Sequence, residues 1–163
     1  MTIAHLDQLA DRYGLFLCVE CGKCSAVCPM GDLYDDYRYD ISPRGIINRG
    51  LVAADFEQDD HLWSCLTCDM CTDLCPAGVQ IRDYVMAVRE WLIAGGHDEH
   101  AAKCSGCGTY IGPRRTDEHL RRTLGEGSGE DLLALCAPCR RREMGRKMST
   151  LVPTRRCQTR LRR

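Results

Sequence analysis

Two cysteine runs constrain the fold of this chain more than any other feature of its sequence. Residues 18–29 read CVECGKCSAVCP and residues 65–76 read CLTCDMCTDLCP, so C-x2-C-x2-C-x3-C-P occurs twice, 47 residues apart (65 − 18). This spacing is that of bacterial [4Fe–4S] sites, in which cysteine thiolates bind a cubane cluster. Because the whole run is repeated with its proline, the sequence predicts two [4Fe–4S] clusters and an electron-transfer role.

The spacing within each run also predicts which thiols share a cluster. Three cysteines of a run can reach one cluster from a single turning loop, and in two-cluster ferredoxins the fourth cysteine binds the other cluster. The predicted ligands of cluster 1 are therefore Cys18, Cys21, Cys24 and Cys75. Those of cluster 2 are Cys65, Cys68, Cys71 and Cys28. A purely structural role for the clusters is an alternative, and so is zinc, which rarely uses so tight a run.

The two runs differ at one position that bears on electron affinity. Asp69 stands in the second run where Gly22 stands in the first. A carboxylate beside a cluster disfavours an added electron, so we expect a lower reduction potential for cluster 2, unless Asp69 points to solvent.

Cysteine usage and hydropathy indicate the compartment. Disulfides are an alternative use of the 13 cysteines, but the odd count and the metal-ligand spacing disfavour them. The first residues lack the basic and then apolar pattern of a signal peptide. No apolar stretch approaches the ~20 residues that a membrane-spanning helix needs. We therefore expect a cytoplasmic protein that does not contact the membrane.

Charge divides the chain into two parts. Residues 1–100 hold 7 Lys+Arg and 17 Asp+Glu, a net charge of 7 − 17 = −10, and residues 101–163 hold 15 and 6, a net charge of 15 − 6 = +9. This asymmetry predicts two modules with different partners. We place the first at 1–96, the second at 101–148, and a basic, disordered tail at 149–163.

Helical periodicity dominates the first module. Helices are predicted over 2–13, after Ser42 as N-cap with Pro43 at the first helical position, and over 80–94 before Gly95. Asp59 and Asp60 are expected to cap a short helix before the second run, and 31–40 is expected to be a loop. No strand pattern occurs before residue 100. The predicted fold class is mainly α, an alpha-helical ferredoxin domain followed by a small zinc-ribbon-like module.

Three segments carry a resemblance to a known family. The two runs, SPRGII at 42–47 and WSCLTCDMCTDLCP at 63–76 resemble the two-cluster ferredoxin subunit of heterodisulfide reductase, and more broadly the iron–sulfur subunits of the succinate dehydrogenase type. The resemblance covers about residues 5–95, and the 36 residues between Cys28 and Cys65 distinguish it from short-gap ferredoxins. It implies a hetero-oligomeric complex, in which the chain passes electrons between a flavin- and cluster-bearing subunit and a catalytic subunit.

The second module carries its own four-cysteine pattern. Cys104-x2-Cys107 is followed by Cys136-x2-Cys139, with 28 residues between the pairs, as in zinc ribbons with a long insert. Four thiolates close a tetrahedral structural zinc site. A single iron and a third cluster are alternatives. A helix capped by Thr116 is expected between the pairs, ending at Gly125.

Other features carry less information about function. His97 and His100 are expected to be solvated linker residues, and Cys157 a free thiol. The basic tail lacks the interleaved aromatic residues of a nucleic-acid site, so nucleic acid is not the expected partner. No nucleotide loop or other substrate site is visible, so the chain is not expected to catalyse a reaction by itself. A freely diffusing ferredoxin and an iron–sulfur DNA-binding regulator are the competing functions.

Overall fold

The computed structural model describes residues 3–52, 56, 60–125 and 129–151 of the chain. Its described elements are mainly helical, with a single two-stranded sheet, as the sequence predicts. No helix among the described residues is both long and apolar enough to cross a membrane.

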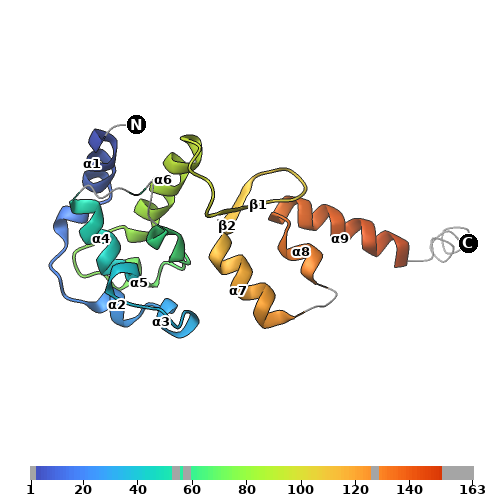
Figure 1. Ribbon diagram of the computed structural model, residues 1–163, viewed down its shortest axis with the longest axis horizontal. Coiled ribbons are helices and arrows are strands. Elements are labelled where there is room, and N and C mark those ends of the chain that lie inside the picture. The colour runs from blue at the N-terminus through green and yellow to red at the C-terminus, as the bar shows by residue number, and fades with distance from the viewer. Residues whose placement is uncertain (1–2, 53–55, 57–59, 126–128, 152–163) are drawn as a thin grey trace, which may run out of the picture.

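The first part of the chain is a cluster of short helices around three longer ones (Figure 1). The longer helices are α1 (Ile3–Arg12), α4 (Pro43–Leu51) and α6 (Ile81–Ala94). The short α-helices are α2 (Lys23–Ala26), α3 (Met30–Leu33) and α5 (Met70–Asp73), and the 3₁₀ helices are η1 (Leu15–Leu17), η2 (Tyr39–Ile41) and η3 (His61–Ser64). Helices α1, α4 and α6 pack on one another and enclose the core, so the cysteine loops are held against a rigid support.

Local sequence signals explain where these helices begin and end. Ser42 caps α4: its hydroxyl accepts a hydrogen bond from the Gly45 amide at 3.1 Å, and Pro43 opens the helix. Gly45 is needed because a Cβ there would lie 2.1 Å from the carbonyl oxygen of Tyr39. Gly95 ends α6 as predicted. Most of the apolar stripe of α6 is buried and Trp91 is partly buried, which explains the strong helical periodicity of the sequence there.

Some predicted boundaries are wrong. The stretch expected to be a loop contains the end of α3 and the start of η2. Asp60 occupies the N-cap position of η3, but its side chain makes no capping hydrogen bond. Asp59 lies outside the described residues. Helix α7 (Arg114–Leu124) begins directly after Pro113, so Thr116 lies inside the helix rather than capping it. It ends at Gly125, as predicted.

The second part of the chain holds a hairpin and three helices. Strands β1 (Ala101–Lys103) and β2 (Tyr110–Pro113) pair antiparallel, with the first cysteine pair in the loop between them. Helix α7 leads to α8 (Glu130–Leu133) and to α9 (Ala137–Leu151), which extends away from the rest (Figure 1). The last turn of α9 includes the first residues of the segment expected to be a tail, and 152–163 lie outside the described residues.

The second part packs directly against the first. Arg115 donates a hydrogen bond to the Ser64 hydroxyl at 3.1 Å, forms an ion pair with Asp36 and lies over the ring of Tyr34. Tyr110 meets Trp63 edge to face, with ring centroids 6.0 Å apart. These contacts cover the 3₁₀ helix η3 that precedes the second cysteine run. The carbonyl oxygen of His100 accepts a hydrogen bond from the Arg114 amide at 2.8 Å. The segment 95–100 that connects the two parts is therefore held against the second part.

Candidate iron–sulfur and thiolate metal sites

The eight thiols of the two runs line two separate cavities, four to each. One cavity is bordered by Cys18, Cys21, Cys24 and Cys75. The other is bordered by Cys28, Cys65, Cys68 and Cys71. Each cavity thus combines three cysteines of one run with the fourth cysteine of the other run. This is the grouping that crossed ligation of two cubane clusters requires.

The two cysteine loops repeat the same backbone geometry. Glu20 and Gly22 have φ of 55° and 75°, and their counterparts Thr67 and Asp69 have φ of 52° and 73°. Positive φ is unfavourable for a residue with a side chain, most of all for a β-branched one such as Thr67. Such strain is kept where the backbone shape serves a site. Here it turns the main chain around the thiols.

Several N–H groups point at the sulfur atoms. The amide of Thr67 lies 3.4 Å from Cys65 Sγ, and the amide of Val79 lies 3.4 Å from Cys75 Sγ. At the other loop the Arg44 guanidinium donates to Cys18 Sγ at 3.1 Å. Hydrogen bonds of this kind stabilise negative charge on sulfur and are one of the levers that set cluster potentials.

Burial makes the inner thiols poor acids in the absence of a metal. Desolvation raises the pKa of Cys24, Cys28 and Cys65, and that of Cys71 to about 12. A free buried thiol of this kind is unreactive, whereas a bound metal ion deprotonates it outright. Four converging thiols with N–H donors therefore fit an iron–sulfur cluster and do not fit a nucleophile.

The carboxylate that distinguishes the second run is paired. Asp69 Oδ2 lies 3.7 Å from a guanidinium nitrogen of Arg82, and both side chains are partly exposed. Its charge is therefore partly offset by Arg82 and partly solvated. Asp69 borders the cavity of the cluster 2 cysteines, so its effect on the potential of cluster 2 stays a prediction, which the pair with Arg82 weakens.

The entrances to the two cysteine loops have opposite surroundings. Three large apolar side chains next to Cys18 are exposed: Phe16 (62%) and Leu17 (60%) before it, and Val19 (65%) after it. The counterparts of the first two, 47 residues later (16 + 47 = 63, 17 + 47 = 64), are Trp63 and Ser64, which are 3% and 0% exposed. The C-terminal part of the chain covers Trp63 and Ser64, and nothing in the described residues covers the three side chains at the first loop.

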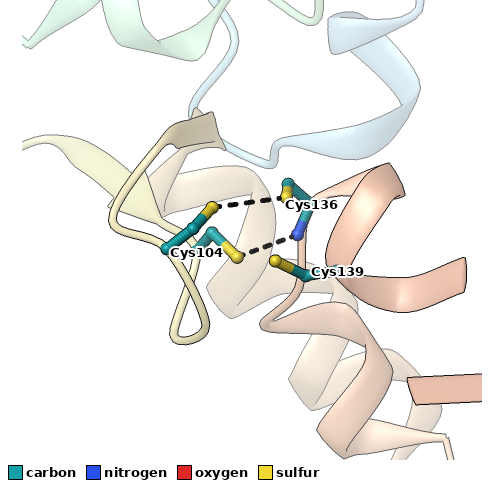
Figure 2. Close-up of side chains that lie close together, drawn as sticks. Cys104, Cys136 and Cys139 are labelled. Carbon is teal, nitrogen blue, oxygen red and sulfur yellow. Dashed lines mark hydrogen bonds between the residues drawn. The ribbon is translucent and has the colours of Figure 1, made fainter. Parts of the chain in front are cut away.

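The second metal site is formed by both ends of the C-terminal module. The loop between β1 and β2 carries Cys104 and Cys107, Cys136 lies directly before α9, and Cys139 lies in its first turn. Figure 2 shows Cys104, Cys136 and Cys139 close together. All four Sγ atoms lie within 4.8 Å of one another. A Zn–S bond of ~2.3 Å places tetrahedral thiolates about 3.8 Å apart. The four thiols therefore fit one tetrahedral ion with little rearrangement.

Hydrogen bonds prepare this site for anionic sulfur. The amides of Cys136 and Gly106 point at Cys104 Sγ at 3.2 and 3.4 Å, and they lower the pKa of Cys104 to about 6. Arg142 donates to Cys139 Sγ at 3.2 Å. A Cβ at Gly106 would lie 3.2 Å from Cys139 Sγ, so a larger residue there would crowd this thiol. These contacts favour a metal-bound thiolate, for which zinc is the predicted ion.

Both metal regions border a common groove. A cavity of about 560 Å³ is lined by Leu66 and Thr67 of the second cysteine loop and by Cys136 of the C-terminal site. The C-terminal metal site therefore lies on the same side of the molecule as cluster 2.

Other predicted site residues lie apart from the metals. His100 is partly buried against Trp63, with ring centroids 6.3 Å apart, so it is not a solvated linker residue. His97 is also partly buried. Neither belongs to the four-thiol group. Cys157 lies outside the described residues. Sequence reasoning missed Arg44 and Arg89, which approach the cysteines only through the folding of α4 and α6.

Comparison with known proteins agrees with the geometry. The family described as 4Fe-4S dicluster domain matches residues 13–79, a span that holds both cysteine runs. No curated protein matches the chain. The match supports an iron–sulfur, ferredoxin-like region at residues 13–79 with a role in electron transfer.

Proposed function

We propose that this chain is the electron-transfer subunit of an oxidoreductase complex in the cytoplasm. Two [4Fe–4S] clusters would relay electrons between a flavin- and iron–sulfur-bearing subunit and a catalytic subunit, as in heterodisulfide reductase. The 4Fe-4S dicluster match supports the electron-transfer role. The sequence resemblance around 42–47 and 63–76 supports the more specific assignment.

The residues of the chain hold and separate the two redox sites. Each cluster, when bound, accepts and releases one electron. Crossed ligation by Cys28 and Cys75 ties the two loops together, so neither site can move without the other. The buried packing of α1, α4 and α6 limits reorganisation around the thiols. This arrangement suits a fixed conduit better than a substrate-converting site.

The observation that carries the proposal is the exposed apolar surface at the first cysteine loop. Phe16, Leu17 and Val19 form this surface, which we call the loop-1 patch. Adjacent large apolar side chains on a surface commonly mark protein interfaces. In the second repeat the equivalent positions are covered by a folded module of the same chain, through Tyr110 and Arg115. We infer that a partner subunit with its own redox centre covers the loop-1 patch.

The C-terminal module has a structural role in this proposal. Cys104, Cys107, Cys136 and Cys139 would hold one Zn²⁺, and a site closed by four thiolates leaves no position for a substrate. The metal would join the hairpin to α9. It would thereby keep Tyr110 and Arg115 in place over η3.

The first test is metal analysis of anaerobically purified protein. About eight iron, eight sulfide and one zinc per chain are expected. About twelve iron without zinc would make the C-terminal site a third cluster. Little sulfide with two or more zinc would contradict the electron-transfer function.

The second test is co-purification from the native host. Phe16→Asp should abolish recovery of the partner subunits while cluster content is unchanged, because it places a charge in the loop-1 patch. Leu124→Asp is the matched control, since Leu124 is also exposed but lies at the end of α7 in the other module. A wild-type chain that purifies alone, with all its clusters, would instead favour a freely diffusing ferredoxin.

A further inference from the structure

Two buried arginines lie beside the predicted cluster ligands, one at each site, whereas Arg82 at the cluster 2 cavity is exposed and pairs with Asp69. Arg44 on α4 is 9% exposed, and Arg89 on α6 is 1% exposed. Burying a guanidinium is costly unless an anion or several hydrogen-bond acceptors compensate its charge. The groups around each arginine therefore show how its charge is compensated.

Arg89 is held in place by neutral groups. Its Nη2 donates to the carbonyl oxygens of Leu62 and Cys65 at 2.6 and 2.7 Å, and its Nη1 donates to the Tyr110 hydroxyl at 3.3 Å. The guanidinium carbon lies 5.4 Å from the ring centroid of Trp63. Its buried Nε has no hydrogen-bond partner. Among the described residues no carboxylate forms an ion pair with Arg89, so its positive charge is not neutralised.

Arg89 is bonded to the main chain of the second cysteine loop, so the second cluster site is the negative group on which its charge can act. Arg89 donates a hydrogen bond to the carbonyl oxygen of Cys65, one of the predicted ligands of cluster 2. Four thiolates around an iron–sulfur core carry net negative charge. A buried cation next to such a site acts through a low dielectric, where charge interactions are strong.

Arg44 acts on the first site by a different route. It donates directly to Cys18 Sγ at 3.1 Å and also forms an ion pair with Glu20. Glu20 is an exposed residue of the first cysteine loop. Its carboxylate offsets part of the charge of Arg44, and solvent screens the pair further. The two arginines thus differ. Arg44 contacts a ligand sulfur directly but its charge is partly offset by Glu20, whereas Arg89 contacts the main chain and no carboxylate among the described residues offsets its charge.

We infer that Arg44 and Arg89 set the reduction potentials of the two clusters separately, Arg44 that of cluster 1 and Arg89 that of cluster 2. The inference rests on the proposed presence of two [4Fe–4S] clusters. Reduction adds one electron and no proton to a site, so its negative charge grows by one unit. A fixed neighbouring cation stabilises that reduced form and raises the potential. Both arginines are positioning residues, since neither binds iron.

The test is an anaerobic redox titration followed by electron paramagnetic resonance. Cys21→Ser and Cys68→Ser, each changing an exposed predicted ligand of one cluster, identify which signal belongs to which site. Arg89→Met should then weaken the reduction equilibrium of cluster 2 at least tenfold, which lowers its midpoint potential by about 59 mV for one electron, and leave cluster 1 nearly unchanged. Arg44→Met should do the reverse.

Conservative variants keep the inference testable if a methionine variant fails to assemble its cluster. Arg89→Lys retains the charge and should shift cluster 2 less than Arg89→Met. Glu20→Gln changes an exposed side chain and should raise the potential of cluster 1 alone, because it leaves Arg44 uncompensated. Tyr110→Phe removes a hydrogen bond to Arg89 without removing charge and should shift cluster 2 only slightly.

The outcomes separate this inference from the proposed function. A wild-type protein without [4Fe–4S] signals would overturn the proposed function before any variant is made. A wild-type protein with two normal clusters, whose potentials do not respond to Glu20→Gln or to loss of the arginine charge, would overturn the inference alone. Equal shifts of both clusters in every variant would also overturn it, because the effect would then be a general one on the fold.

Discussion

The two cysteine loops have nearly the same backbone and very different surroundings. Both turn through two residues of positive φ, and both supply three thiols to one cavity and a fourth to the other. The first loop is flanked by the exposed Phe16 and Leu17, and the second by the buried Trp63 and Ser64. The C-terminal module causes this difference. A repeated ligand geometry thus provides two similar sites, and unequal packing makes them different in access and in electrostatics.

Under the proposed function, the unequal packing limits where redox partners would approach each cluster. A partner subunit can approach cluster 1 closely at the loop-1 patch. At cluster 2 the same approach is covered by Tyr110 and Arg115, so a redox partner would approach from another side. The groove shared by the second cysteine loop and Cys136 is a candidate for that side. Substitutions in one loop that leave the other unchanged test this difference. Their expected effects range from loss of a cluster to a change of about 1 kcal/mol in the free energy of unfolding.

The largest effect is expected from the crossed ligands. Cys75→Ala should abolish cluster 1 although Cys75 belongs to the second run, because it faces the cavity of Cys18, Cys21 and Cys24. Iron and sulfide analysis with electron paramagnetic resonance would show about four iron remaining and only the cluster 2 signal. Loss of the cluster 2 signal instead would show that each run binds its own cluster. Cys28→Ala is the reciprocal variant.

Removing the C-terminal metal should uncover only the second loop. Cys136→Ala is expected to abolish zinc binding, since three thiolates no longer close the site, and to loosen the module that covers η3. Proteolysis should then cut within 101–151, and Trp63 fluorescence should shift to longer wavelength. Iron content should stay at the wild-type value. Unchanged proteolysis after loss of zinc would show that apolar packing alone holds the module.

Equivalent aromatic residues of the two repeats should contribute unequally to stability. Trp63→Ala is expected to cost about 3–5 kcal/mol, because it removes a buried ring that contacts Tyr110 and Arg89. Phe16→Ala should change stability by no more than about 0.5 kcal/mol, because the side chain is exposed. Denaturant unfolding under anaerobic conditions measures both. Similar losses would mean that the loop-1 patch packs within the chain.

The smallest effect is expected from the backbone of the second loop. Asp69 has the positive φ that Gly22 has in the first run. Asp69→Gly should therefore relieve strain and be neutral or stabilising by about 1 kcal/mol. The reverse change, Gly22→Asp, should destabilise by a similar amount. Comparing the unfolding midpoints of the two variants checks the prediction, and a clear loss of stability in Asp69→Gly would show that its pair with Arg82 outweighs the strain.

Most of the helical framework was predictable from local sequence. The cap at Ser42, the stripe of α6 and the stop at Gly95 depend on neighbours within about four residues, where side-chain and backbone preferences act directly. The start of α7 was not predictable in this way. Strand β2 ends at Pro113 and α7 begins at the next residue, so Thr116 lies in the first turn of the helix and is not its N-cap. The Oγ1 atom of Thr116 instead forms a hydrogen bond of 3.0 Å with the hydroxyl of Tyr34 in the first module.

The sequence by itself determined the number and spacing of the thiols, because metal ligation imposes a spacing that can be read directly. Only the tertiary structure decided what surrounds them. The burial of Trp63, the contact of Arg44 with Cys18 and the contact of Arg89 with Leu62 depend on residues more than 20 positions apart in the chain. Such contacts follow from the packing of whole helices, which no local pattern encodes. The spacing of the cysteines therefore determines the kind of site, and the tertiary packing determines how the two sites differ.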